Sequence, residues 1–323
     1  MYLRAAITTF AILAGSTAVQ AQTQVRVASH MSMTGQPIAH AQIFAEEVEK
    51  RFPGEFEFKL YPSAQLGKEA AIISQTKAGT LEIVAVGSGP LALDDKLGVF
   101  DLPWLFKDWA HAERALAGEF GEQVKQLLEE QQNVVALGVY GLDFRQVINK
   151  VHPIVEPADM KGLKIRVTGS KFRVGAFSAM GANPVPIAWS ETFTALQTGA
   201  VDGAESTYAG FYEEKQYEVT KYLSKTNHVF GPTFLLASKV FFSQLTPEQQ
   251  EAFRQIGRDI IPAAMQASQQ ISEKFMIELE KSLEFNDADV DAFAQAAEPI
   301  YDDYISSQGD DWIKLIQQAG EAS

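Results

Sequence analysis

The stretch FEFKLYP, residues 56–62, alternates apolar and polar side chains and stops at a proline, which is the pattern of a β-strand. The residues before it favour a helix, because Pro37 suits a first helical turn and apolar residues recur three and four positions apart as far as Phe52. Outward from these segments, strands are expected at residues 24–30 and 81–86, with a helix over 68–79. This β-α-β-α-β order predicts a parallel sheet with helices on its faces.

The same order is expected again after Asn133, with strands at residues 134–140, 163–167 and 183–187. The last third reads as helical and starts at a capping box in residues 246–249. This helical pattern runs to Phe285 with Pro262 inside it, which predicts either one long kinked helix or two helices. A chain of 323 residues has room for about two domains. We therefore expect two α/β units and a helical segment long enough to span both.

The N-terminus has the composition of an export signal, with Arg4, an apolar run over residues 5–13 and small residues up to Ala21. The apolar run is shorter than the roughly 20 residues that a membrane-spanning helix needs. The sequence contains no cysteine, which excludes both disulfides and lipid attachment through an N-terminal cysteine. We expect residues 1–21 to be a cleavable signal peptide and the rest to be a soluble periplasmic protein.

The overall charge limits the classes of partner. A formal net charge of −14 and a pI near 4.9 disfavour nucleic acid, whose phosphates need a basic surface. An anionic ligand is still compatible, because a few arginines in a desolvated cleft can outweigh a distant acidic surface that salt screens over about 8 Å. The acidic surface and the absence of cysteine favour a monomer.

Catalytic and cofactor motifs are mostly missing from the sequence. The five histidines show no metal-ligand spacing, and neither a phosphate-binding GxxxxGK[ST] loop nor a GxSxG nucleophile elbow occurs. Residues 87–92, GSGPLA, have the spacing of a dinucleotide loop, but Asp94, Asp95 and Pro103 follow where a helix should receive the pyrophosphate. A glycine turn that lines a cleft is the better interpretation. We expect no cofactor and no metal, and an exported enzyme is the disfavoured alternative.

Two arginines follow strand patterns at positions where ordinary packing gives them little role. Arg166 alternates with apolar residues at the carboxyl end of the strand at 163–167, and Arg145 follows the strand at 134–140. Ligands bind beyond the carboxyl ends of strands in open α/β sheets. A guanidinium can hold a carboxylate through two parallel hydrogen bonds, which lysine cannot reproduce. Each arginine is therefore either an anchor for an organic anion or a member of a surface salt bridge.

Several longer motifs carry a resemblance to a known family. They are DMKGLKIRV at 159–167, MGANPVP at 180–186, ALQTGAVDGAE at 195–205, YPSAQLG at 61–67 and YEV at 217–219. In this order they resemble the DctP-type solute-binding proteins of tripartite ATP-independent periplasmic (TRAP) transporters, over essentially the whole chain after the signal. The resemblance implies delivery of the ligand to a TRAP membrane permease that uses a sodium gradient rather than ATP.

The implied fold is an α/β, two-lobed clamp like that of periplasmic binding proteins. Each lobe is a mixed sheet flanked by helices, and crossing strands and a long helix span both lobes. The expected boundaries place residues 22–144 and about 233–271 in lobe I, and residues 145–232 and about 272–323 in lobe II.

The resemblance also implies ligand-binding residues. Arg166 corresponds to the usual carboxylate anchor, and Arg145 occupies the place of an assisting arginine. Many members have asparagine where this chain has Ser206, and Gly87 replaces a polar side chain of sugar-acid binders, which leaves room for ligand. The other expected cleft residues are His30, Glu69, Ser88, Trp189, Tyr208 and Phe211.

The expected ligand is a compact carboxylate with a partly apolar or aromatic body, because the region around Arg166 is rich in aromatic residues. A sugar acid or a sulfonate is the alternative ligand. A binding protein for an ATP-driven transporter and a sensor that presents ligand to a receptor are the alternative roles.

Overall fold

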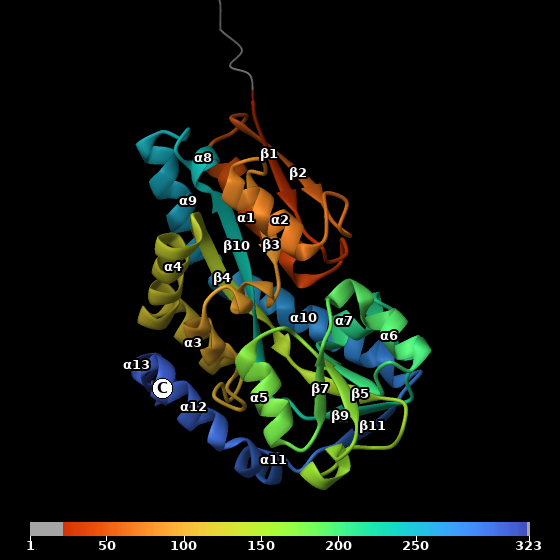
Figure 1. The fold of residues 1–323 in the computed structure, drawn as a ribbon. Coiled ribbons are helices and arrows are strands. Elements are labelled where there is room, and N and C mark those ends of the chain that lie inside the picture. The colour runs from red at the N-terminus through yellow and green to blue at the C-terminus, as the bar shows by residue number, and fades with distance from the viewer. Residues whose placement is uncertain (1–21, 322–323) are drawn as a thin grey trace, which may run out of the picture.

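A computed structural model of the protein describes residues 22–321, so the expected signal peptide at 1–21 lies outside the described residues. The structure has two mixed sheets with helices around them (Figure 1). In spatial order, the first sheet contains β2 (Phe56–Tyr61), β1 (Thr23–Ala28), β3 (Ile83–Val86), β10 (Phe230–Ser238) and β4 (Val134–Phe144). The second contains β11 (Glu284–Asp287), β9 (Tyr222–Lys225), β5 (Gln146–Asn149), β8 (Gly203–Ser206), β6 (Lys164–Val167) and β7 (Asn183–Pro186). The α/β, two-lobed fold with two mixed sheets is confirmed.

In the first sheet, strand β1 pairs in parallel with β2 and β3, as the βαβ pattern predicts. The helices of this unit are α1 (Gln36–Arg51), α2 (Glu69–Ala78), α3 (Trp109–Ala117), α4 (Glu119–Gln132), α8 (Lys239–Phe242) and α9 (Pro247–Asp259). Gly79 ends α2 in the left-handed conformation, where glycine carries no Cβ penalty. The parallel part of this sheet directs the carboxyl ends of β1 and β3 toward the second sheet.

The sequence patterns do not predict strand β10, although it is an interior strand of the first sheet, between β3 and β4. It pairs antiparallel with both β3 and β4, and all nine of its residues are buried. Pro232 interrupts the apolar pattern, and the pairing register with β4 shifts between Gly231 and Pro232. A proline inside a central strand is tolerated at such an irregularity, which is why the local pattern gave no strand.

Two short connections cross between the sheets, in addition to the helical segment that leads from β10 to β11. β4 ends at Phe144 and β5 begins at Gln146, so Arg145 alone joins them, and residues 226–229 connect β9 back to β10. The other helices of the second unit are α5 (Lys171–Ala179), α6 (Thr192–Thr198) and α7 (Tyr208–Glu213). Sequence neighbours at the crossing therefore belong to different sheets.

The long helical segment consists of two helices. The capping box of Thr246 and Gln249 starts α9, and Pro262 lies in the first turn of α10 (Ile261–Glu280). Helix α10 packs against α1 and β4 on one side and against α7 on the other, so it spans both units (Figure 1). The helical pattern stops before Phe285, because residues 284–287 form β11 and pair with β9.

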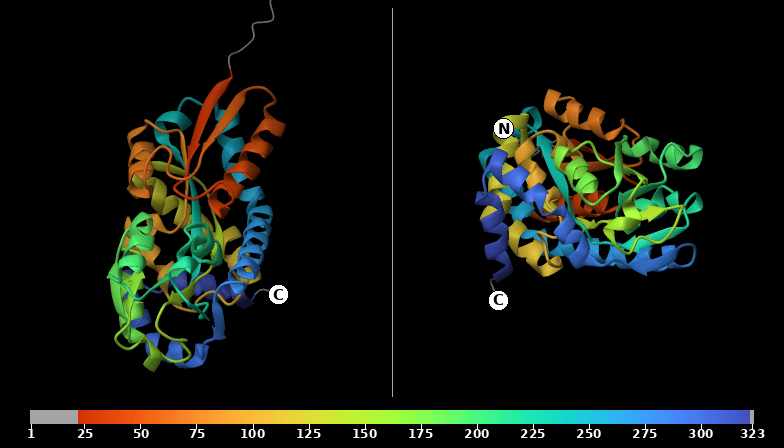
Figure 2. Two further views of the ribbon diagram at one scale, coloured as in Figure 1. Left: turned by 90° about the vertical axis from the view of Figure 1, so that its right-hand side faces the viewer. Right: turned by 60° about the horizontal axis from the view of Figure 1, so that its bottom comes forward.

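The chain ends in α11 (Val290–Ala297), α12 (Pro299–Gln308) and α13 (Asp311–Glu321). Helix α11 packs on α5, whereas α13 returns to pack on α3 and α4 of the first unit (Figures 1 and 2). A lobe boundary at residue 271 therefore stays a proposal for these last helices. Within residues 22–321, no helix is long and apolar enough to cross a membrane.

Candidate ligand-binding site

The topology brings three arginines around one carboxylate. Strands β5, β8 and β6 are neighbours in the second sheet, and they place Arg145, Glu205 and Arg166 together. Helix α5 follows β6 and adds Arg173. All four of these side chains are buried.

Glu205 is the centre of this cluster. Its Oε2 accepts hydrogen bonds from Nε of Arg145 at 2.5 Å and from Nη1 of Arg173 at 2.6 Å. Nε2 of His228 lies 3.5 Å from the same oxygen. Burial opposes ionisation of Glu205, but the guanidinium groups of Arg145 and Arg173 hold its pKa well below the ordinary value. Glu205 is therefore a permanent anion that fixes two of the three arginines.

Arg166 differs from the other two arginines in its unused hydrogen-bonding capacity. Its Nε donates to the carbonyl oxygen of Ile187 at 2.9 Å, while Nη1 is buried without a hydrogen-bond partner among the described residues. The nearest carboxylate atom, Oε1 of Glu205, is 4.0 Å from Nη1. Burial lowers the pKa of Arg166 to about 10, so it is still a cation at neutral pH. A buried cation with an unpaired N–H is the place where an anion would gain most.

Arg173 and Asp101 belong to the cluster but were missed by the sequence analysis. Arg173 is fully buried, and Asp101 accepts hydrogen bonds from its Nε and Nη2. A signal was present, because Arg173 stands three and four positions before the apolar residues Ala176 and Phe177. That spacing places the arginine on the buried face of its helix, where a cation needs a partner.

The first unit contributes residues from the ends of β1 and β3. Nδ1 of His30 lies 3.6 Å from Oε1 of Glu69, and that oxygen accepts a hydrogen bond from the backbone N–H of Gly89. The Oγ atom of Ser88 is buried without a partner. Gly87 is buried as well, yet a Cβ placed there would meet only Leu142, at 3.7 Å. There is thus free space beside Gly87, next to an unsatisfied hydroxyl.

Trp189 and Ser206 lie beside Arg166 in the second unit. The guanidinium carbon of Arg166 is 5.1 Å from the centre of the Trp189 ring, and the indole Nε1 is buried without a hydrogen bond. Ser206 is buried at the end of β8. A Cβ on Gly210 would come within 2.6 Å of Oγ of Ser206 and 3.2 Å of the Trp189 ring, so only glycine fits there.

Direct contacts join the two units near these residues. Oε1 of Glu213, at the end of α7, accepts hydrogen bonds from Ser32 at 2.6 Å and from Thr34 at 2.7 Å. Lys68 and Glu191 form a second bridge, at 3.4 Å and on the surface. The two units therefore meet across the region that contains the unsatisfied polar atoms.

Comparison with known proteins agrees with this arrangement. Residues 19–308 match the family described as "Bacterial extracellular solute-binding protein, family 7", known as DctP. The chain belongs to this family.

A curated relative is the 2,3-diketo-L-gulonate-binding periplasmic protein YiaO of Escherichia coli K12, 35% identical over 75% of this chain and 74% of the relative. A TRAP periplasmic solute binding protein from Bordetella bronchispeptica, with density attributed to pantoate, has a TM-score of 0.86 and 32% identity, and the match covers 94% of this chain and 100% of that one. One from Sulfitobacter sp. NAS-14.1, with bound β-D-galacturonate, has a TM-score of 0.84 and 30% identity, with 92% and 100% covered. The chain is therefore similar, along nearly all of its described length, to TRAP solute-binding proteins for organic acids.

The aromatic residues expected in the cleft of this solute-binding protein have other surroundings. Phe211 is fully buried in the hydrophobic core of the second unit, with Ile148, Leu223 and Leu279. Tyr208 belongs to the same core and stacks on Phe285, with 6.4 Å between the ring centres. Packing accounts for both side chains, so contact with ligand stays a prediction for them.

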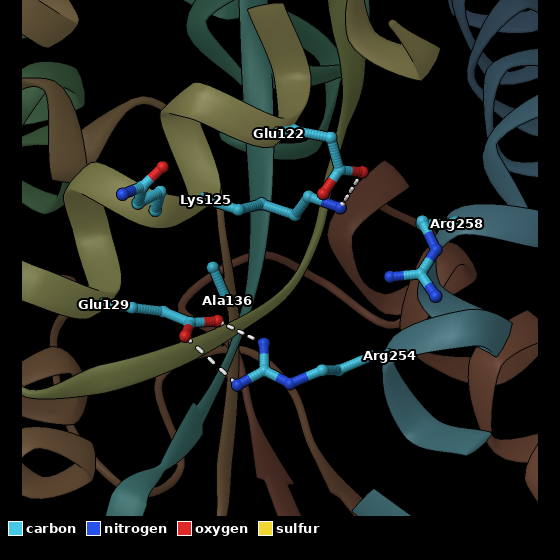
Figure 3. A pocket seen from close by; sticks show the side chains of 7 residues that line it. Glu122, Lys125, Glu129, Ala136, Arg254 and Arg258 are labelled. Carbon is cyan, nitrogen blue, oxygen red and sulfur yellow. Dashed lines mark hydrogen bonds and ion pairs between the residues drawn. The ribbon is translucent and has the colours of Figure 1, made fainter. Parts of the chain in front are cut away.

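A charged surface pocket of about 220 Å³ lies elsewhere on the protein, between α4 and α9 (Figure 3). Arg254 pairs with Glu129 at 2.5 Å and 3.1 Å, and Lys125 pairs with Glu122 at 2.6 Å. These charges satisfy one another, and none of the lining residues belongs to the candidate site. Among residues 22–321, no group of three or more histidine, aspartate or glutamate side chains is placed to hold a metal ion.

Proposed function

We propose that this TRAP solute-binding protein captures a small hydroxylated organic acid between its two units and that Arg166 anchors the ligand carboxylate. The observation that supports this most is the unpartnered Nη1 of Arg166 in a residue only 3% exposed. Nε is held by Ile187, which orients the guanidinium. A carboxylate that accepts from Nη1 would supply the missing partner through a charge-assisted hydrogen bond.

Hydroxyl groups on the ligand are proposed because other buried polar atoms nearby also lack partners. These atoms are Oγ of Ser88, Nδ1 of His30 and Nε1 of Trp189. Leaving such groups unpaired costs about 1–3 kcal/mol each, so a ligand that pairs with them gains affinity. An aromatic ligand body without polar substituents would leave these atoms unpaired. The ring of Trp189, which the Arg166 guanidinium covers on one side, offers apolar surface for the C–H groups of a compact acid.

The remaining features of the proposed role follow the family. The protein is exported by cleavage of residues 1–21, acts in the periplasm as a monomer, and passes its ligand to a sodium-coupled TRAP permease.

In the proposed role, the protein binds its ligand without converting it, and the carboxylates and histidine of the arginine cluster are structural. His228 supports this, because burial lowers its pKa to about 4 and Glu205 only partly opposes the shift. A group whose pKa lies so far from neutral pH is a poor general base.

The test is a thermal-shift screen of the protein against hydroxy acids, sugar acids, aromatic acids and sulfonates. A ligand at a hundredfold excess over its dissociation constant stabilises the native state by about 2.7 kcal/mol. Arg166→Ala should weaken binding of any hit by about 2–5 kcal/mol, because a buried charge partner is removed. Arg166→Lys should also weaken it, because the fork geometry is lost. Arg254→Ala, in the surface pocket, is the control and should bind normally. An Arg166→Ala variant with unchanged affinity would refute the assignment.

A further inference from the structure

The buried charges around Arg166 do not balance. Three guanidinium groups, of Arg145, Arg166 and Arg173, face two carboxylates, of Asp101 and Glu205, and all five residues are at most 4% exposed. One positive charge is left over. This excess charge lies on Arg166, because Glu205 and Asp101 accept hydrogen bonds from the other two arginines.

Two further buried groups near the cluster change this balance only in part. Burial lowers the pKa of His228 to about 4, so its ring is neutral at pH 7. Burial raises the pKa of Asp143 to about 7, and Arg145 opposes that shift only weakly. A partly protonated Asp143 offsets the excess incompletely. The arginine end of the site can thus neutralise one carboxylate and no more.

Carboxylates also border the site on its other side. Glu69 comes from the first unit and lies close enough to Arg166 to raise the pKa of that residue, against the larger effect of burial. Glu214 comes from the second unit, and burial, together with the charge of Glu213, raises its pKa while nearby His30 opposes the shift. Glu213 is next to it, with Oε2 buried and unpartnered. Glu69 and Glu214 both lie near His30, and Lys274 is the cation nearest in effect to Glu213. The carboxylates on this side of the site therefore outnumber the cations.

We infer that the site selects monocarboxylates with a hydroxylated tail and rejects dicarboxylates. One ligand carboxylate matches the excess charge at Arg166. The other end of the ligand meets acceptors, which take hydrogen bonds from hydroxyl groups and repel a second carboxylate. This inference rests on the proposed function.

Glu69 is the residue best placed to make this distinction. Its Oε1 is fixed by the backbone N–H of Gly89 and lies beside His30. A Cβ on Gly89 would overlap the Glu69 carboxyl group, at 2.4 Å, so the close approach of this turn holds the carboxylate in place. A fixed acceptor discriminates between a hydroxyl and a carboxylate more sharply than a mobile one, because it cannot move away from the repulsion.

The experiment compares acids that differ at a single terminal carbon. Galactonate and galactarate form one pair, and erythronate and meso-tartrate form another; in each, a terminal CH₂OH becomes a carboxylate. Titration calorimetry at pH 7 should show the monocarboxylate of the bound pair to be tighter by about 100-fold, since like charges placed together cost several kcal/mol. Glu69→Gln keeps an acceptor for Gly89 and should reduce this ratio by about tenfold, mainly through better binding of the dicarboxylate.

Glu47→Gln is the matched control, because it removes the same charge from the exposed side of α1, where Glu47 pairs with Lys50. It should leave the ratio unchanged. Equal or tighter binding of the dicarboxylate would overturn the inference while leaving the proposed function in place. Binding of neither acid in either pair, nor of any other hydroxy acid, would overturn both. An equal change in ratio in Glu69→Gln and Glu47→Gln would show that net charge, and not Glu69, sets the preference.

Discussion

Glu205 holds a position that no neutral residue could fill. Removing one member of a buried ion pair leaves its partners uncompensated, and Glu205 is bound directly to two arginines. Its remaining oxygen, Oε1, is buried without a hydrogen bond and lies 4.0 Å from Arg166. The same carboxylate therefore stabilises the fold and helps to hold the ligand anchor in its ionised state.

Glu205→Gln should destabilise the protein by about 3–5 kcal/mol, because the cluster would bury three arginines against a single carboxylate. Urea unfolding without ligand measures this. Glu57→Gln, on the exposed side of β2, is the control and should change stability by less than about 0.5 kcal/mol. A Glu205→Gln variant as stable as the control would mean that the cluster does not depend on this charge.

At the level of single residues, the sequence identified the arginines that stand where a periodic pattern is broken. Arg166 interrupts the apolar set of its strand, and Arg145 follows a strand end. Glu205 lies within the motif at 195–205 and has no sequence signal of its own, because its partners come from three other segments of the chain. Whether the Ser88 hydroxyl finds a hydrogen-bond partner depends on how closely the two units approach each other, and no local sequence pattern predicts that distance.

At the level of elements, periodicity predicted those helices and strands in which the apolar residues of the element itself mark its buried face. Helix α1 and strand β2 agree with the prediction to within one residue. The strands β5, β8, β9 and β11 have four residues each and exist because a neighbour pairs with them. Length alone is not the reason, because β3 and β6 are equally short but lie in apolar or alternating runs that predict a strand. The four missed strands lack such a run, and the helical pattern that precedes β11 extends into it.

The contact between α7 and the loop before α1 is the element-level feature with the clearest consequence. Glu213 accepts from both Ser32 and Thr34, and these hydroxyls belong to the other unit. Since a clamp must open to release its ligand, these bonds must break before release. They stabilise the closed arrangement without being part of the arginine site.

Glu213→Ala should therefore speed ligand dissociation by about tenfold, equivalent to the net worth of about one hydrogen bond to a charged group in a partly exposed place. Association should change less, because the open form already lacks these bonds. Stopped-flow measurement of both rates separates the two effects. Glu218→Ala, an exposed residue just beyond α7, should leave both rates unaltered. A slower association with unchanged dissociation would contradict the closing role.

At the scale of the whole molecule, the buried groups with shifted pKa values make stability depend on pH in opposing directions. Burial lowers the pKa of His40 to about 3 and that of His228 to about 4. The unfolded chain takes up protons at these histidines first, so their effect is to reduce stability as the pH falls from about 6.5. Burial raises the pKa of Asp143 to about 7, which has the reverse effect.

Asp143 lies at the end of β4, near Ser272 of α10 and the start of α7, where the two units join. In the folded protein it holds its proton up to about pH 7, whereas in the unfolded chain it loses the proton near pH 4. Stability from this group is therefore present below pH 4 and lost as the pH rises through 7.

Asp143→Asn should remove that loss. The wild-type curve alone mixes this effect with those of the histidines, so the informative quantity is the difference between the two proteins. From pH 4.5 to 7.5 the variant should gain free energy of unfolding relative to the wild type, measured by urea denaturation at each pH. Asp302→Asn, on the exposed side of α12, should give a difference that does not vary with pH. A flat difference for Asp143→Asn as well would mean that the carboxyl is ionised in the folded protein, and the buried charges around Arg145 would then be fully balanced without a ligand.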